Sequence, residues 1–145
     1  MRKSILIVLI MLGACAPQKV QPVESIKPKA GLLNDNQFRL VEKANEKSYA
    51  YDKSNPVKVG GSKENNGQKN ERRFLNALRG PKGEEVRYVK AGSCCQFKTT
   101  NATAGAGKLD RYKIFWYGSK DTLSIYINMY DKGPLKIPMG LTADK

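Results

Sequence analysis

Hydrophobic and polar side chains alternate most regularly near the end of the chain. Between Leu123 and Tyr130, leucine, isoleucine and methionine occupy every second position, and Ser124, Tyr126 and Asn128 lie between them. A period of two is typical of a strand with one buried face. An apolar and aromatic run at 109–117 precedes this segment, and Gly-Ser-Lys-Asp at 118–121 is typical of a tight connection. We therefore predict two long paired strands over 109–117 and 122–130.

The rest of the chain contains shorter runs and one helical pattern. Apolar and β-branched residues predict strands over 38–41, 48–51, 57–59 and 85–89. The pattern at 71–79 predicts a helix, with Phe74, Leu75 and Leu78 on one face, Asn70 as the N-cap and Gly80-Pro81 as the stop. Polar stretches at 62–70 and 99–108 read as loops. These elements predict an α+β domain in which one helix packs on a small antiparallel sheet.

The first residues have a different character. Arg2 and Lys3 precede an apolar run from Ile5 to Leu12, which small residues follow. This order is typical of an export signal. The run is much shorter than the roughly 20 apolar residues of a membrane-spanning helix.

The segment Leu12-Gly13-Ala14-Cys15 resembles the bacterial lipobox. The resemblance implies that residues 1–14 are removed as a lipoprotein signal peptide and that Cys15 carries acyl chains such as palmitate. Ala16 after the cysteine, in place of aspartate, favours the outer membrane, facing the periplasm. The alternative is an ordinary cleaved signal with a chance cysteine. Residues 15–36 carry three prolines among polar residues and predict a linker, so the folded domain is expected over 37–145.

The charge favours an anionic neighbour in the envelope. Removal of the signal takes away Arg2 and Lys3, which leaves 24 of the 26 basic residues against 13 acidic ones, a formal charge of +11. Such a balance suits the membrane that the lipid contacts, an anionic envelope polymer, or another envelope protein. The alternative is that dispersed lysines only keep the protein soluble, since no run of five like charges occurs. Nucleic acid is not expected outside the cytoplasm.

Two groups of surface residues are candidates for binding. Arg72 and Arg73 lie on the polar side of the predicted helix and form a basic face. Trp116, Tyr126 and Tyr130 occupy the predicted strands, and their rings could stack on a sugar or a partner. For both groups the alternative is structural, a solvated helix face or cross-strand packing.

The chain lacks the residue types of several common catalytic sites. It has no histidine, which excludes Ser-His and Cys-His pairs and imidazole metal sites. We expect no cofactor and no metal. Four acidic residues could supply paired carboxylates, but their spacing does not bring any two together: Asp52, Glu71, Asp110 and Asp121.

Cys94 and Cys95 are adjacent, and the lipobox resemblance assigns the third cysteine to lipid. An oxidising envelope favours a disulfide between them. One interpretation is a rigid turn in which Gly92-Ser93 bends the chain out of its strand. The others are a redox switch, a thiolate metal site, and a bridge to another molecule.

Four segments resemble a group of small envelope lipoproteins of unknown role. They are residues 55–61, 73–81, 92–97 and 109–128, within a resemblance that covers about 49–142. Members of that group sometimes carry the label 2-dehydro-3-deoxyphosphooctonate aldolase. Such an aldolase needs a barrel of about 250 residues, whereas 131 residues remain after export.

The expected function is therefore a lipid-anchored binding or assembly module of the cell envelope. The alternative is an enzyme, either the aldolase or a thiol oxidoreductase that uses Cys94 and Cys95.

Overall fold

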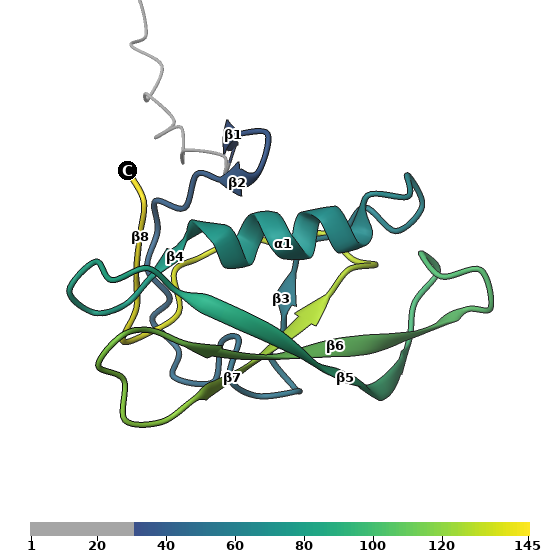
Figure 1. Cartoon of the computed structure of the whole chain (residues 1–145). Helices are drawn as coiled ribbons and strands as arrows, with labels where there is room; N and C mark the ends of the chain where they lie inside the picture. The colour runs from purple at the N-terminus through teal and green to yellow at the C-terminus, as the bar shows by residue number, and fades with distance from the viewer. Residues whose placement is uncertain (1–30) are drawn as a thin grey trace, which may run out of the picture.

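The computed structural model describes residues 31–145. The predicted signal peptide, Cys15 and most of the predicted linker lie outside the described residues. Figure 1 shows one helix lying over a twisted sheet. In chain order the elements are β1 (Leu32–Asn34), β2 (Gln37–Phe38), β3 (Val57–Lys58), α1 (Gly67–Ala77), β4 (Leu78–Arg79), β5 (Arg87–Lys98), β6 (Ala106–Phe115), β7 (Leu123–Asn128) and β8 (Thr142–Ala143).

The main sheet has the strand order β3-β7-β6-β5. β6 pairs antiparallel with both β5 and β7, whereas the short β3 pairs parallel with β7. α1 covers one face of this sheet (Figure 1). The α+β prediction is confirmed, although the sheet has a parallel edge strand and β1-β2 and β4-β8 form two separate two-stranded sheets.

α1 begins and ends earlier than the sequence predicts. It starts at Gly67, so Asn70, the expected N-cap, lies inside the helix. The Asn70 side chain instead donates to the carbonyl oxygen of Gly60 at 3.0 Å, and so ties the helix to the loop before it. At the other end Leu78 adopts an extended conformation, because it pairs with Ala143 of β8. The predicted cap and the predicted stop at Gly80-Pro81 were both wrong.

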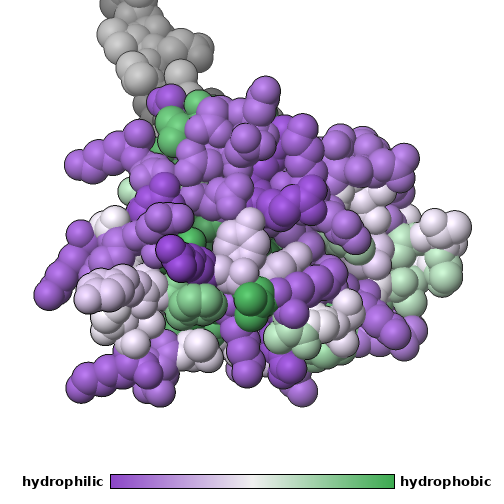
Figure 2. All heavy atoms as spheres, viewed as in Figure 1, coloured by the Kyte–Doolittle hydropathy of each residue, from purple (hydrophilic) through white to green (hydrophobic). Residues whose placement is uncertain are grey.

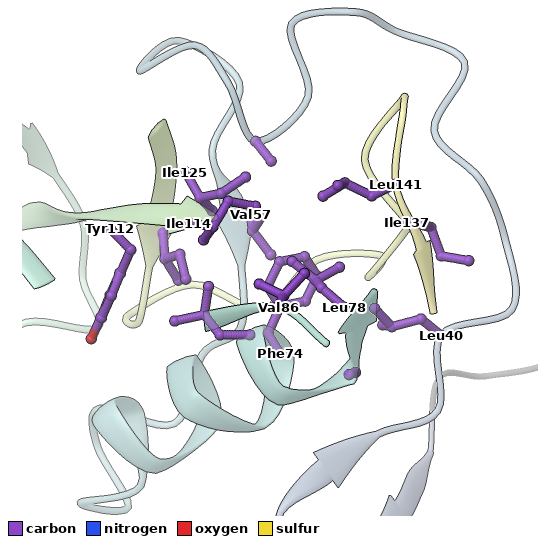
Figure 3. Packing of buried hydrophobic residues seen from close by; sticks show 14 of the residues in the cluster. Leu40, Val57, Phe74, Leu78, Val86, Tyr112, Ile114, Ile125, Ile137 and Leu141 are labelled. Carbon is purple, nitrogen blue, oxygen red and sulfur yellow. The ribbon is translucent and has the colours of Figure 1, made fainter. Parts of the chain in front are cut away.

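The core lies between α1 and the sheet. Figure 3 shows Phe74, Leu78 and Val86 meeting between the helix and the strands. Ile125 and Ile127 of β7 are fully buried, as their alternation predicts. Burial of such side chains contributes roughly 1.5–3 kcal/mol each to folding.

The segment at 48–51 is not the predicted strand. It is a turn in which Ala50 has a positive φ of 70°. Its side chain is nevertheless fully buried, and its carbonyl oxygen accepts a hydrogen bond from the Tyr126 amide at 2.8 Å. The segment therefore contacts β7 through a turn and does not add a strand to the sheet.

Part of the segment predicted as a linker forms a strand, because β1 lies at Leu32–Asn34. β1 and β2 form a short hairpin beside α1. The Gln37 side chain donates to the Asn76 carbonyl oxygen and to the Asp144 carboxylate, both at 2.9 Å. Arg79 forms an ion pair with the same carboxylate. The hairpin, the end of α1 and the C-terminal strand are thereby joined at one place.

Candidate functional site

A disulfide joins Cys94 to Cys95 inside β5. The predicted turn at this place is wrong, because the strand continues through the pair and remains paired with β6 up to Lys98. The two Cα atoms are 3.7 Å apart, and the extra residue is taken up by a shift of register between Cys94 and Gln96. Cys95 has a positive φ of 60°, which is uncommon for residues other than glycine.

The strand register assigns each side chain to a face of the sheet. Directly opposed residues of antiparallel strands point to the same side. Ser93 opposes Asp110, and Lys90 opposes Tyr112, and all four face α1. The next residue of β5, Cys94, opposes Leu109. Successive residues of a strand point to opposite faces, so the disulfide lies on the side of the sheet away from α1.

A hollow of about 580 Å³ lies on this outer side beside the disulfide. We call it the disulfide hollow. Cys95, Phe97 and Leu109 supply its apolar wall, and Lys53, Lys58 and Lys98 supply three cations. Lys53 lies in the loop before β3, Lys58 lies in β3, and Lys98 is the last residue of β5. Its size is within the usual range for pockets that bind small molecules.

Asp131 is the one acidic residue of the disulfide hollow, and its charge is already held by neighbouring donors. Thr99 Oγ1 and Asn101 Nδ2 donate to Asp131 Oδ1 at 2.6 and 2.8 Å, and Asn128 Nδ2 donates to Oδ2 at 3.0 Å. Partial burial by itself raises the pKa of Asp131, but these bonds and the charge of Lys58 outweigh it, so the pKa is lower than usual. Asp131 therefore fastens the loop at 99–105 to the end of β7 as a carboxylate.

Two carboxyl groups meet on the opposite side, between the sheet and α1. Glu71 of α1 is fully buried, and Asp110 of β6 is 3% exposed. Tyr112 donates its hydroxyl to Glu71 Oε2 at 2.8 Å. Lys90 Nζ donates to Asp110 Oδ2 at 2.6 Å, and the Ser93 hydroxyl donates to Asp110 Oδ1. Asp110, Lys90 and Ser93 also line a second hollow of about 360 Å³.

Glu71 lies where its ionised form is disfavoured. Its Oε1 atom receives no hydrogen bond from any donor within residues 31–145. The neighbouring carboxylate of Asp110 disfavours the ionised form of Glu71 further. Burial first, and then the charge of Asp110, raise the pKa of Glu71 from 4.5 to about 7, against the opposing effects of Tyr112 and Lys90.

The structure thus brings together two of the four acidic residues considered from sequence. Asp52 is exposed, and the Ser54 amide and hydroxyl donate to its carboxylate in a local turn. Asp121 is exposed in the β6–β7 connection. Glu71 and Asp110 are 39 positions apart, and only the packing of α1 on β6 brings them together. No short-range pattern in the sequence carries that information.

The predicted surface residues do not form one site. Tyr126 faces away from α1, opposite Arg111. Tyr130 packs edge-on against Phe97 and lines the second hollow, on the α1 side. Trp116 packs at the edge of the core beside Gly80.

The two arginines predicted as a basic face also have separate roles. Arg72 is exposed on α1. Arg73 donates to the Asp35 carbonyl oxygen at 2.8 Å and to Asn70 Oδ1 at 3.0 Å, which holds the β1–β2 hairpin. Arg73 is therefore occupied by a structural contact.

Three further properties complete the description of residues 31–145. No cluster of three or more histidine, cysteine, aspartate or glutamate residues suited to a metal occurs in residues 31–145. None of the helices in that region is long and apolar enough to cross a membrane. In the view of Figure 2 the surface is mostly hydrophilic, and hydrophobic residues are visible only as small separate patches.

Comparisons with known proteins add no family to this description. No family model, no curated protein and no solved structure matches the chain.

The buried acid predicts an unusual dependence of stability on pH. Below pH 4.5 Glu71 is protonated in both the folded and the unfolded chain. Between 4.5 and about 7 only the unfolded chain releases this proton, so the free energy of unfolding decreases as the pH rises, and the loss is complete above 7. We expect Glu71→Gln, which keeps the shape and can donate to Asp110, to remove roughly 3 kcal/mol of this loss.

Urea unfolding between pH 4.5 and 8 measures this difference. Glu64→Gln, at an exposed position of the loop before α1, is the matched control and should follow the parent. Parallel curves for the parent and Glu71→Gln would show that Glu71 is already ionised in the folded protein.

The disulfide predicts the mass of one tryptic peptide. The protein is unfolded in denaturant that contains an alkylating agent and no reductant, and is then digested with trypsin. The digestion releases residues 91–98, a peptide that contains Cys94 and Cys95 but not Cys15. We expect this peptide to be unlabelled and lighter than its reduced form by two hydrogen atoms. Two labels on the peptide would show free thiols in the protein.

Proposed function

We propose that this chain is a lipid-anchored protein of the bacterial cell envelope that binds an acidic sugar without transforming it. The observation that carries the binding is the disulfide hollow, which combines an apolar wall with three lysines. A sugar ring presents an apolar face and polar edges, and a hollow of about 580 Å³ has room for one or two rings. The geometry therefore supports an acidic sugar better than an apolar ligand.

The lysines of the disulfide hollow are available for an anion. The ion pairs found within residues 31–145 are Arg79–Asp144, Lys90–Asp110 and Lys136–Glu42, and none of them uses Lys53, Lys58 or Lys98. Asp131 offsets one of these charges, since Lys58 acts on its pKa, so three lysines and one carboxylate leave the lining with a formal charge of +2. A carboxylate or phosphate on the ligand would gain contacts that the protein does not make by itself.

The disulfide supports binding by giving this wall a fixed shape. A covalent link between adjacent residues restricts the bulge of β5, so Cys95 and Phe97 hold their places without a ligand. A wall that is already ordered costs less conformational entropy on binding. This role needs no change of oxidation state.

An enzyme is the second candidate, because Cys95 lines a hollow that a small substrate could enter. In a thiol oxidoreductase the Cys94–Cys95 disulfide would accept two electrons from a partner dithiol, which becomes a disulfide, and the open dithiol would then be reoxidised by a second disulfide. The aldolase reading has less support, since one helix and small sheets do not resemble a barrel of eight strands and eight helices.

Binding is tested by calorimetric titration with digalacturonate, a sugar with one carboxylate on each ring. We expect Lys53→Gln/Lys58→Gln to weaken binding about tenfold, since each lysine contributes charge to the hollow. Lys63→Gln/Lys69→Gln removes two exposed lysines near the start of α1 and is the matched control. Neutral maltose should not bind.

The binding proposal is contradicted if the parent does not take up digalacturonate. It is also contradicted if the control pair weakens binding as much as the pair in the hollow. Catalytic reduction of the Cys94–Cys95 bond by a dithiol, with turnover, would favour the oxidoreductase.

The anchor is tested at Cys15. We expect the parent to incorporate labelled palmitate and to sediment with the outer membrane, because two or more acyl chains hold a protein stably in a bilayer. Cys15→Ser should lose the label, whereas Cys94→Ser should keep it. A parent without label would leave an ordinary cleaved signal as the explanation of residues 1–15.

A further inference from the structure

The outer side of the sheet carries a strip of cations beyond the disulfide hollow. Arg87 opposes Phe115, Val89 opposes Lys113, and Gly92 opposes Arg111. These residues alternate with the ones that face α1, so they point to the outer side. We define the outer strip as Arg87, Val89, Arg111, Lys113, Phe115 and Tyr126.

Charge is divided unequally between the two faces of these strands. Asp110 is the one acidic residue in β5, β6 and β7, and it faces α1. The outer strip therefore has three cations and no carboxylate. Arg87 and Lys113 are exposed and Arg111 is half-buried, and none of the three takes part in the ion pairs found within residues 31–145.

Apolar groups lie between these cations. Phe115 and Tyr126 are half-buried, and each opposes an arginine across the strands. Val89 is 53% exposed near the start of β5, which is an edge strand of the sheet. Half-exposed rings beside cations suit a ligand that has both apolar faces and negative charge, as an acidic sugar has.

The outer strip continues into the disulfide hollow. Arg111 is two residues from Leu109 on the same side of β6, and Leu109 lines the hollow. A Cβ atom at Gly92, between the two regions, would meet no atom within 4 Å outside its chain neighbours, so the surface is open at that position. From Arg87 to Lys98, β5 spans about 35 Å at the usual rise of a strand.

We propose that the ligand of the disulfide hollow is one part of a long polyanionic glycan, and that this polymer continues along the outer strip. The inference rests on the proposed function, since the hollow supplies the first contact and the strip extends it. A linear chain of acidic sugars places charge and ring faces at regular intervals, which matches cations and rings along one strand. A flat, fluid lipid surface has no such order.

The proposal predicts that affinity depends on the length of the polymer. Galacturonate oligomers of two and ten units serve as probes. We expect the decamer to bind about 100-fold more tightly than the dimer, because contacts on the outer strip become intramolecular once the hollow is filled. Added salt should weaken the decamer more than the dimer.

Three triple variants separate the two regions. Arg87→Gln/Arg111→Gln/Lys113→Gln should remove most of the advantage of the decamer and leave the dimer unchanged. Lys53→Gln/Lys58→Gln/Lys98→Gln should weaken both. Lys63→Gln/Lys69→Gln/Lys82→Gln removes the same charge at exposed positions elsewhere and should change neither. Equal melting temperatures for the three variants would establish that each is folded.

The outcomes distinguish the two proposals. Equal affinity for dimer and decamer, or an equal loss of affinity in the control triple variant, would overturn the proposal for the outer strip. Neither result would contradict binding of the dimer in the disulfide hollow. Failure of both probes to bind would overturn the proposed function as well. Binding to vesicles of anionic phospholipid as tight as to the decamer, and lost in the strip variant, would assign the strip to a membrane surface and overturn the glycan.

Discussion

The antiparallel pairing of β5 with β6 determines the chemistry of both faces of the sheet. A shift of one residue in this register would turn every side chain of β5 to the other side. In the observed register Lys90 and Ser93 meet Asp110 beneath α1, and Arg87 and Val89 face outward. The bulge at the disulfide lies between two parts of the paired strand. It absorbs one residue, and the pairing then continues to Lys98.

The pair of carboxyl groups beneath α1 is tolerated because the raised pKa of Glu71 lets it keep a proton below about pH 7. Two buried carboxylates side by side would each lose hydration and repel the other. With Glu71 neutral, one negative charge remains, and Lys90 compensates it at 2.6 Å. The Lys90 side chain is 40% exposed, so its own desolvation is modest. A polar cluster of this kind fixes α1 against β6 through directed bonds, which an apolar contact of similar size would not do.

The sequence predicted the parts of the fold that depend on local periodicity. Ile125 and Ile127 are buried where alternation places them, and Phe74 and Leu75 form the inner face of α1. The predictions were wrong where a distant partner overrides a local preference. Asn70 has the chemistry of an N-cap but bonds to Gly60, and Leu78 leaves the helix because β8 pairs with it. The 48–51 segment has strand-forming residues, yet Ala50 is held in a turn by its contacts.

The candidate site, too, depends on distant partners more than on local sequence patterns. Adjacent cysteines are visible in the sequence, but their place in a continuous strand follows from the pairing of ten positions of β5 with β6. The lysines of the disulfide hollow come from three separate segments, and nothing in their spacing connects them. A vicinal disulfide cannot clip two distant parts of the chain, so it adds little through loop closure. Its effect is local, at the bulge where β5 meets Leu109, and that is the place where the hollow and the cations of the outer side converge.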